Sequence, residues 1–216
     1  ARVERFVFLG SSCIYPRECP QPIKEDYLLT GPLEQTNSAY AIAKIAGIEL
    51  IRSYRKQFNH RWISLMPTNM YGPKDNFNLQ TSHVLPALIN RFVTAAQEGK
   101  SSVTLWGTGS PRREFLHSQD LADATLLALE KYDSDQHLNI GTGEDLTIKE
   151  LAELIAAQAG FTGEIQWDST KPDGTPRKVL DVSRLKSLDW TPKIDLQSGI
   201  RSTIEWFKAN QSKVRA

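Results

Sequence analysis

Short apolar runs alternate along this chain with longer stretches whose apolar residues recur at helical spacing. The apolar runs predict strands at 3–9, 63–66, 103–106 and 138–140. The amphipathic stretches predict helices at 38–58, 83–96, 118–131, 147–160 and 199–210. Apolar strands that alternate with helices are typical of a parallel sheet buried on both faces. The pattern therefore predicts an α/β fold.

The connections between these elements are polar or rich in proline. Residues 16–32 hold four prolines and few periodic apolar positions, which predicts an ordered loop over an active site. Residues 71–82 predict another loop, and 168–177 a polar connection. The two Gly-Thr-Gly sequences at 107–109 and 141–143 resemble phosphate loops, but they lack the following glycine and helix, so we interpret both as turns.

The helix at 38–58 carries a further prediction about its orientation. Ser38 is the candidate cap at its start. Ile42, Ala46 and Leu50 are spaced four apart, so they share one face of the helix. We predict that this face packs against the core.

The composition is that of an ordinary globular protein and excludes several classes of function. Of 216 residues, 40% are hydrophobic and 24% charged, and the net charge of +1 argues against a nucleic-acid partner. No apolar run approaches the ~20 residues that span a bilayer, and no signal segment precedes the first strand. Two cysteines, Cys13 and Cys19, make no disulfide framework, and no Cys/His cluster has metal-ligand spacing. We expect a cytoplasmic protein without a membrane, nucleic-acid or metal partner.

Tyr40 and Lys44 are the strongest candidates for chemistry. They lie four apart on a predicted helix, so their side chains leave the same face one turn apart. A neighbouring ammonium stabilises the phenolate and lowers a phenol pKa from its reference near ~10, which makes the phenol a usable proton donor or acceptor. Ser11 and Cys13 follow the first strand, and in extended backbone both would point to the same side. Open α/β sheets place their chemistry at such strand ends.

Six segments carry a resemblance to a known family. They are residues 10–16, 40–47, 66–73, 75–77, 82–88 and 113–117. Together they resemble the extended short-chain dehydrogenase/reductase family, and within it the NADPH-dependent enzymes that epimerise GDP-4-keto-6-deoxy-D-mannose at C3 and C5 and reduce it at C4. The resemblance runs from about Phe6 to Phe207. It implies the C-terminal part of a Rossmann-type doubly wound parallel sheet with a smaller α/β substrate-binding domain.

The resemblance implies a role for each matching residue. Ser11, Tyr40 and Lys44 would carry out the C4 reduction, with Tyr40 as the proton donor. Cys13 and His83 would transfer protons at C3 and C5 as base and acid. The implied NADP(H) contacts are Leu9, Gly10, Ser11, Ser12, Lys44, Pro67, Thr68, Asn69, Met70 and His83. The implied GDP-sugar contacts are Arg91, Trp106, Arg113 and Asp173.

One motif of that family is missing. Its members open with a Gly-x-x-Gly-x-x-Gly turn that binds the cofactor pyrophosphate, and nothing in this sequence matches it. We expect the C-terminal two thirds of a longer enzyme; a protein that never had the other half is the alternative. Residues 1–75 and about 110–140 would be the remaining part of the NADP-binding domain, and about 76–109 and 141–216 the nucleotide-sugar-binding domain. The resemblance also implies a homodimer packed through the Tyr40 helix.

Two other interpretations stay open. The first is another nucleotide-sugar enzyme of the same family, either a C4 epimerase or a 4,6-dehydratase. Dehydratases place an acidic pair after the strand-end Ser or Thr, where this chain has Ser12-Cys13-Ile14, and a C4 epimerase needs no proton-transfer pair such as Cys13 and His83. The second is a non-enzymatic module that only binds a nucleotide sugar or partner chains, which the missing cofactor turn favours.

Overall fold

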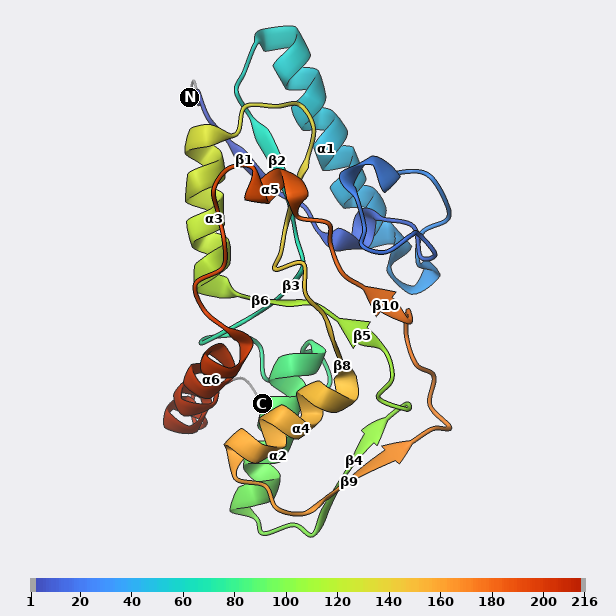
Figure 1. Ribbon diagram of the computed structural model, residues 1–216, viewed down its shortest axis with the longest axis vertical. Coiled ribbons are helices and arrows are strands. Elements are labelled where there is room, and N and C mark those ends of the chain that lie inside the picture. The colour runs from blue at the N-terminus through green and yellow to red at the C-terminus, as the bar shows by residue number, and fades with distance from the viewer. Residues whose placement is uncertain (1–2, 215–216) are drawn as a thin grey trace. The chain divides into compact units, whose positions relative to one another are not determined.

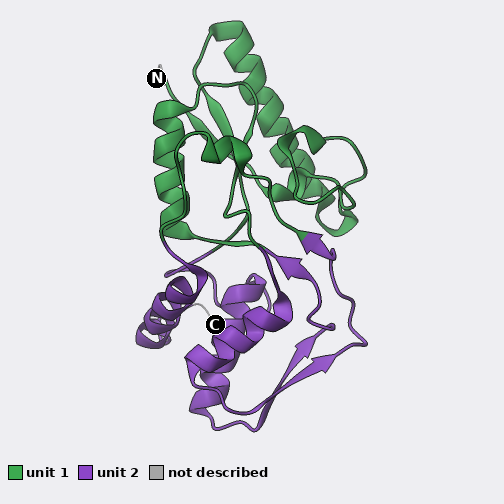
Figure 2. Cartoon of the chain, in the orientation of Figure 1, with its two compact units in different colours: residues 1–70, 114–144, 178–193 green, residues 71–113, 145–177, 194–216 purple. Residues whose placement is uncertain are grey.

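The computed structural model describes residues 3–214 and has the predicted alternation of strands and helices. The chain forms two compact units, which Figure 2 shows in different colours. The first unit contains Ala1–Met70, Glu114–Glu144 and Lys178–Lys193. The second unit contains Tyr71–Arg113, Asp145–Arg177 and Ile194–Ala216.

The boundary seen in the structure differs from the sequence-based one at residues 178–193, which the sequence grouped with the sugar-binding part. They lie in the first unit because long-range hydrogen bonds hold them there. The Leu180 amide donates to the Glu114 carboxylate, and the Ile23 amide donates to the Val179 carbonyl, both within that unit. The assignment of the two units to cofactor and sugar stays a prediction.

A three-stranded parallel sheet forms the centre of the first unit (Figure 1). Its order is β1 (Val7–Leu9), β2 (Ile63–Pro67) and β7 (Leu138–Ile140), and the register pairs Leu9 with Leu65 and Leu65 with Leu138. Every side chain of β2 and β7 is buried, as expected for strands covered on both faces. The carboxyl ends of the three strands therefore lie along one edge of the sheet.

Two long helices complete this parallel arrangement. Helix α1 (Ser38–Phe58) connects β1 to β2, and α3 (Ser118–Lys131) precedes β7; Figure 1 shows them on opposite sides of these strands. Both helices have the bounds that the sequence predicted. The shorter elements are β3 (Asn69–Tyr71), β6 (Phe115–His117), β10 (Arg177–Lys178), α5 (Ser183–Lys186) and the 3-10 helices Ser12–Ile14, Glu25–Tyr27 and Gln35–Asn37.

The predicted core face of α1 is wrong. Ile42 and Leu50 are 58% and 57% exposed, and Ala46 is exposed as well. The buried positions of this helix are Ala41, Ile48 and Ile51. Apolar residues occur on two faces of α1, so spacing alone could not decide which face meets the sheet.

Helix α1 lies close to β1 because Gly47 has no side chain. A β-carbon at this position would collide with the ring of Phe8. One turn earlier on the helix, the Lys44 ammonium lies 5.3 Å from the centre of the same ring. Phe8 thus fixes the approach of the helix segment that carries Tyr40 and Lys44.

The second unit is built from three helices and short strands. Helices α2 (Val84–Gln97), α4 (Ile148–Ala159) and α6 (Leu196–Asn210) pack on one another around an apolar core. Strand β4 (Ser102–Trp106) pairs in parallel with β9 (Glu164–Asp168), and β5 (Arg112–Arg113) pairs antiparallel with β8 (Leu146–Thr147).

Local signals explain how these elements begin and end. A capping box is present at the start of α4, because Thr147 and Glu150 exchange hydrogen bonds there. The helix ends at Gly160, whose φ of 83° suits a residue without a β-carbon. Strand β9 was not predicted, although Ile165 and Trp167 alternate with polar residues there. Among residues 3–214, no helix combines the length and the apolar character needed to cross a membrane.

Candidate active site

The Tyr40–Lys44 pair lies one turn apart on α1, next to the carboxyl end of β1. The Lys44 ammonium donates a 2.8 Å hydrogen bond to the Leu9 carbonyl and lies 5.5 Å from the centre of the Tyr40 ring. Tyr40 is 46% exposed, so its hydroxyl can meet a ligand from solvent. An ammonium, a phenol and a strand end are thereby brought together at the edge where open α/β sheets bind ligands.

Ser11 and Cys13 follow β1 in a geometry that the sequence did not predict. Residues Ser12–Ile14 form a 3-10 turn, so the assumption of extended backbone for Cys13 is wrong. The Ser11 hydroxyl caps this turn and accepts a 3.2 Å hydrogen bond from the Cys13 amide. The cap favours the turn because it satisfies an amide that the short helix leaves without a partner. The turn packs against α1, which keeps Cys13 near the helix that carries Tyr40.

Lys178 is a neighbour of Cys13 that sequence reasoning missed. Its ammonium lies 3.6 Å from the Cys13 sulfur, within the first unit, across a separation of 165 residues. Lys178 directly follows the polar connection 168–177 and is the last residue of β10, and nothing in the local sequence marks it.

The residues predicted to line the cofactor form the carboxyl ends of β1 and β2. The Gly10 amide donates to the Leu65 carbonyl, and a β-carbon on Gly10 would collide with Met66. After β2, the Thr68 amide donates to the Ile140 carbonyl. Leu9 and Met70 are 44% and 41% exposed. Exposed apolar side chains at this edge fit a flat, partly apolar ring such as nicotinamide.

Of the other predicted cofactor contacts, Ser12 and Pro67 are buried and Asn69 is partly buried. The Asn69 side-chain amide donates a 2.9 Å hydrogen bond to the Glu114 carbonyl. The Thr68 hydroxyl donates to the same oxygen at 3.4 Å. The segment after β2 is thus held by the backbone of Glu114.

Glu114 is a fully buried carboxyl group that sequence reasoning also missed. Its carboxylate accepts hydrogen bonds from the backbone amides of Thr142, Gly143 and Leu180 at 2.6, 2.8 and 2.9 Å. Burial raises its pKa, and the hydrogen bonds from Gly143, Leu180, Thr68 and Thr142 act against that increase. The second Gly-Thr-Gly turn therefore has the anion-binding arrangement of a phosphate loop, but the chain's own carboxylate fills it.

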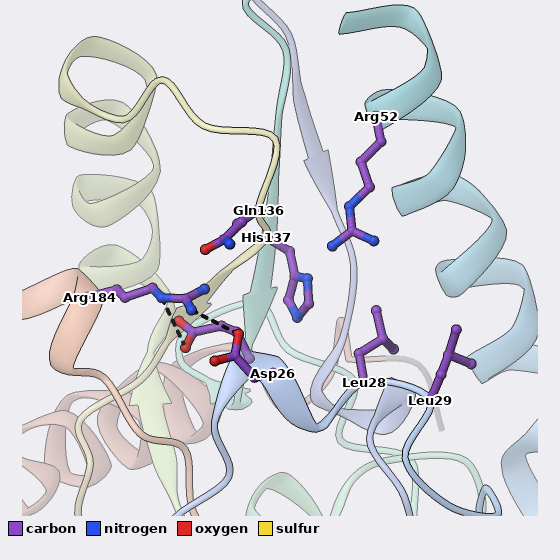
Figure 3. Close-up of a pocket in the computed structure, with 8 residues that line it drawn as sticks. Asp26, Leu28, Leu29, Arg52, Gln136, His137 and Arg184 are labelled. Carbon is purple, nitrogen blue, oxygen red and sulfur yellow. Dashed lines mark hydrogen bonds and ion pairs between the residues drawn. The ribbon is translucent and has the colours of Figure 1, made fainter. Parts of the chain in front are cut away.

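A cavity of about 180 Å³ also lies in the first unit, and none of the predicted site residues lines it (Figure 3). Arg184 pairs there with Glu25 at 3.7 Å and Asp26 at 2.9 Å. His137 points into the same space, and burial together with the nearby Arg52 and Arg184 charges lowers its pKa to about 4. The charges in this cavity are paired and its imidazole is neutral, which indicates a structural role.

That structural role extends to the segment that follows Cys13. The His137 Nε2 atom lies 3.1 Å from the Tyr15 hydroxyl, and this hydroxyl donates to the Asn139 side chain. Burial is the main cause that raises the pKa of Tyr15 well above its ordinary value, so the phenol is neutral. The network ties the loop after Cys13 to β7.

His83 directly precedes α2 in the second unit and is exposed. Asp75 is the acidic group beside it: burial raises the pKa of Asp75, and the Asn76 amide and the charge of His83 lower it. Asp75 also borders a cavity of about 560 Å³ lined by Lys74–Asn78, Thr81, Trp206, Lys213 and Val214. The loop 71–82, predicted from its polar sequence, therefore shapes the surroundings of His83.

The four predicted sugar contacts all lie in the second unit. Arg91 on α2 donates to the Thr104 carbonyl at 3.2 Å, two residues before Trp106 on β4. Trp106 is 71% exposed, and the Lys171 ammonium lies 5.9 Å from its ring centre. An exposed indole beside cations suits an anionic nucleotide.

Asp173 and Arg113 lie near the turn that follows Trp106. The Asp173 carboxylate accepts hydrogen bonds from the Thr108 amide and hydroxyl at 2.9 and 2.7 Å, and these bonds lower its pKa. A β-carbon on Gly174 would lie 3.2 Å from the Arg113 guanidinium, so these two segments are in close contact. Burial lowers the pKa of Arg113. The first Gly-Thr-Gly turn, 107–109, is thus shaped by an exposed carboxylate.

The structure groups the predicted residues into two sets. Ser11, Cys13, Tyr40 and Lys44 surround the end of β1 in the first unit. Arg91, Trp106, Arg113 and Asp173 occupy the second unit, together with His83. The meeting of Cys13 and His83 at one substrate stays a prediction.

The first strand of the parallel sheet is followed by Gly-Ser-Ser-Cys and then by a helix with Tyr-x-x-x-Lys, the arrangement that the resemblance to extended short-chain dehydrogenases/reductases implies. The family model of the NAD dependent epimerase/dehydratase family matches residues 1–141. The chain belongs to this family.

Within this family, the chain is similar to proteins named GDP-L-fucose synthase. Putative GDP-L-fucose synthase 2 of Arabidopsis thaliana is 56% identical over 210 residues, which is 96% of this chain and 63% of that protein. GDP-L-fucose synthase of Escherichia coli K12 is 49% identical and the match covers 99% of this chain and 69% of that protein. The chain thus spans slightly less than two thirds of the length of the Arabidopsis relative.

Solved structures agree with the sequence relatives. A GDP-L-fucose synthetase from Naegleria fowleri with NADP bound superimposes with a TM-score of 0.93 at 31% identity, covering 99% of this chain and 69% of that chain. A GDP-6-OMe-4-keto-L-xylo-heptose reductase from C. jejuni gives 0.89 at 35% identity, covering 96% and 71%.

Proposed function

We propose that the protein catalyses the NADPH-dependent 3,5-epimerisation and 4-reduction of GDP-4-keto-6-deoxy-D-mannose to GDP-L-fucose, the activity of a GDP-L-fucose synthase. The observation that carries the proposal is the Lys44 ammonium held between the Tyr40 ring and the Leu9 carbonyl at the carboxyl edge of the sheet. The names of the relatives from Arabidopsis thaliana and Escherichia coli support it independently.

In the reduction, Tyr40 donates a proton to the substrate C4 oxygen. The positive charge of Lys44 favours the phenolate that remains, which lowers the barrier to this transfer. Ser11 donates a hydrogen bond to the same oxygen and so holds the carbonyl in place. The exposure of Tyr40 and its position beside the strand end favour this assignment.

In the epimerisation, Cys13 removes a proton from a carbon next to the ketone and His83 returns a proton from the other face. Such protons are acidic because the negative charge that forms is shared with the carbonyl oxygen. A thiolate at Cys13 is the form that accepts the proton. His83 is exposed at the start of α2, so its side chain is open to a ligand.

NADPH fits the edge formed by β1 and β2. Lys44 would hold the nicotinamide ribose through the donors that its ammonium does not use on Leu9. The exposed side chains of Leu9 and Met70 would lie against the ring, and Gly10 permits a close approach of the backbone. The bound cofactor supplies the hydride for the reduction. The remaining predicted contacts are Ser11, Ser12, Pro67, Thr68, Asn69 and His83.

The GDP-sugar would bind to the second set of residues. Arg91 and Arg113 carry the positive charge for the diphosphate, and Arg can pair with such a group through two parallel hydrogen bonds. Trp106 offers an exposed flat face to the base or a sugar. Asp173 holds the turn after Trp106 and offers an acceptor to a sugar or base donor.

Solvent exchange and reduction give separate tests of the two halves of the reaction. Cys13→Ser in the intact protein is expected to lower deuterium incorporation at C3 and C5 by about 100-fold, the usual scale for a general base, and to spare reduction of an already epimerised ketone. Tyr40→Phe is expected to do the reverse. Mass spectrometry of the sugar in D₂O measures the exchange, and NADPH absorbance measures the reduction.

The outcome also separates the alternatives. Exchange at C3 and C5 that survives Cys13→Ser would refute the role of this thiol. A wild-type protein that exchanges neither position would favour a C4 epimerase. An intact wild-type protein that binds the GDP-sugar but turns over neither step would favour a binding module.

A homodimer is part of the proposal, with α1 at the contact. Its exposed face carries Ile42, Leu50, Tyr54 and Phe58, which are 36% to 58% exposed, and such an apolar stripe is costly in water. Leu50→Glu would place two like charges in a symmetric contact. Sedimentation velocity is expected to show a dimer for the wild type and a weakened one for this variant. A wild-type monomer at micromolar concentration would contradict this assembly.

A further inference from the structure

The Lys178 ammonium is in contact with the Cys13 sulfur and can therefore influence the charge of this thiol. Its ammonium lies 3.6 Å from the thiol sulfur, and both residues belong to the first unit. Among residues 3–214, no carboxylate lies within 4.0 Å of this ammonium, so its charge is not spent on an ion pair. We propose that Lys178 is a positioning residue that keeps Cys13 in the thiolate form, the base form required for the epimerisation; this inference rests on the proposed function.

The need for such a partner follows from the chemistry of a thiol. At the reference value of ~8.5, only about 3% of a cysteine is thiolate at pH 7. A cation in contact with the sulfur favours the anion, and each tenfold change in the equilibrium gives nearly tenfold more base while the thiolate is the minor form. A 3-10 turn of three residues provides no helix dipole of useful size, so the positive charge has to come from a side chain.

The backbone beside Lys178 is fixed by hydrogen bonds within the first unit. The Val179 amide donates to the Gln21 side chain at 3.0 Å, and the Ile23 amide donates to the Val179 carbonyl at 2.8 Å. The next amide, that of Leu180, donates to the buried Glu114 carboxylate at 2.9 Å. A lysine anchored this firmly at its backbone loses less freedom when its ammonium reaches the thiol.

Other titratable groups lie near Cys13 in the sequence or on α1, which packs against its turn. Those on the adjoining elements are Tyr15, Cys19, Tyr40 and Lys44. The Tyr15 hydroxyl is turned to Asn139, and the Lys44 ammonium donates to the Leu9 carbonyl. These two groups therefore have other partners, and Lys178 is the cation that contacts the sulfur.

The two thiols of the chain, Cys13 and Cys19, differ in their surroundings. Burial raises the pKa of Cys19, and the charge of Lys178 opposes that increase without overcoming it. Lys178 thus lies near both sulfur atoms, but it contacts only Cys13 within hydrogen-bond distance. We expect Cys13 to be the reactive thiol and Cys19 the inert one.

The proton transfer balances without any further reagent. The thiolate of Cys13 takes a proton from the carbon next to the ketone, the C–H bond breaks and its electron pair moves into the enolate. The negative charge leaves the sulfur and appears on the substrate oxygen. Lys178 stabilises the charge before the transfer and takes no proton itself.

Alkylation of the thiols at different pH values measures the proposed effect directly. The intact protein is treated with iodoacetamide from pH 5 to 10, and peptide mass spectrometry follows Cys13 and Cys19 separately. Lys178→Met, which removes the charge and keeps the length, is expected to slow alkylation of Cys13 at pH 7 by about tenfold and to shift the midpoint of its pH profile upward. Lys178→Arg is expected to restore most of the rate.

Lys186→Met is the matched control, because Lys186 is exposed on α5 in the same unit. It is expected to leave the Cys13 profile unchanged. Circular dichroism of each variant tests whether it is folded. The variants are then assayed for deuterium exchange at C3 and C5, where Lys178→Met is expected to lower kcat about tenfold and to spare reduction of an epimerised ketone.

Two results would overturn the inference. One is a Cys13 alkylation profile that Lys178→Met leaves unchanged; the other is exchange with a raised KM and an unchanged kcat, which would make Lys178 a contact for the substrate diphosphate. If the wild type itself catalyses no exchange, the proposed function fails. The alkylation profile still separates that failure from a failure of the Lys178–Cys13 contact, because it needs no substrate.

Discussion

The two Gly-Thr-Gly turns of this chain hold a carboxylate in the same way but in opposite surroundings. At 141–143, backbone amides of the turn donate to Glu114, which is 0% exposed. At 107–109, the Thr108 amide and hydroxyl donate to Asp173, which is exposed. Neither turn has room for a phosphate on these amides while its carboxylate is in place.

The difference between the turns lies in what water can replace. If the Glu114 carboxylate is removed, three amides lose their acceptor in a place that water reaches poorly. If Asp173 is removed, solvent takes over its hydrogen bonds. The same motif thus binds a buried carboxylate that stabilises the first unit, and an exposed carboxylate on the surface of the second unit.

Matched carboxylate-to-carboxamide changes should give the largest contrast between the turns. Glu114→Gln is expected to lower the free energy of unfolding by about 3 kcal/mol, because a carboxamide offers one acceptor oxygen and points an NH₂ at a buried donor. Asp173→Asn is expected to leave the unfolding midpoint close to that of the wild type. Urea unfolding followed by fluorescence measures both.

Equal losses for the two variants would break the comparison and show that burial is not what separates the turns. A small loss for Glu114→Gln alone would mean that the first unit relaxes and admits water to the amides of Thr142, Gly143 and Leu180.

The pH dependence of stability should differ in sign between the two carboxylates, which is a smaller effect. The pKa of Glu114 is raised in the folded protein, so its contribution to stability is present below ~4.3 and is lost as the pH rises through the folded value. The pKa of Asp173 is lowered, so its contribution is present above ~3.9 and is lost as the pH falls through the folded value.

Difference curves against Glu114→Gln and Asp173→Asn isolate these two contributions. The wild type is expected to lose part of its advantage over Glu114→Gln as the pH increases, and its small advantage over Asp173→Asn as the pH decreases. Chemical unfolding at intervals between pH 3 and pH 8 supplies the curves. Two curves of the same slope would contradict the stated cause, which is burial at one turn and hydrogen bonding at the other.

Much of the fold could be predicted from local sequence. Periodicity predicted the bounds of α1 and α3, because a helix depends on contacts three and four residues apart, and local caps mark the ends of α4. The predicted cap of α1 is wrong: Ser38 is the first residue of the helix, and Asn37 holds the N-cap position without a side-chain hydrogen bond. The core face of α1 could not be predicted, since Ile42 and Leu50 have the same spacing and apolarity as buried residues. Which face is covered depends on the sheet, and that information is distant in the chain.

In the candidate site too, contacts between residues near in sequence could be predicted and contacts between distant residues could not. Tyr40 and Lys44 are near in sequence, so their geometry followed from the helix period. The contacts of Cys13 with Lys178 and of Glu114 with Leu180 cross 165 and 66 residues, and only the folded chain brings them together. The turn at Ser12–Ile14 was missed because extended backbone was assumed from Ser11 to Cys13, whereas the Ser11 hydroxyl caps a turn there.

Gly47 limits which residues α1 can carry where it faces β1. Even an alanine there would collide with the Phe8 ring, so either the ring or the helix that carries Lys44 would have to shift. The lack of a β-carbon at Gly47 thus affects the position of Lys44, three residues earlier on the helix. The absence of a side chain at residue 47 therefore sets how closely strand β1 and the helix that carries Tyr40 and Lys44 can approach each other.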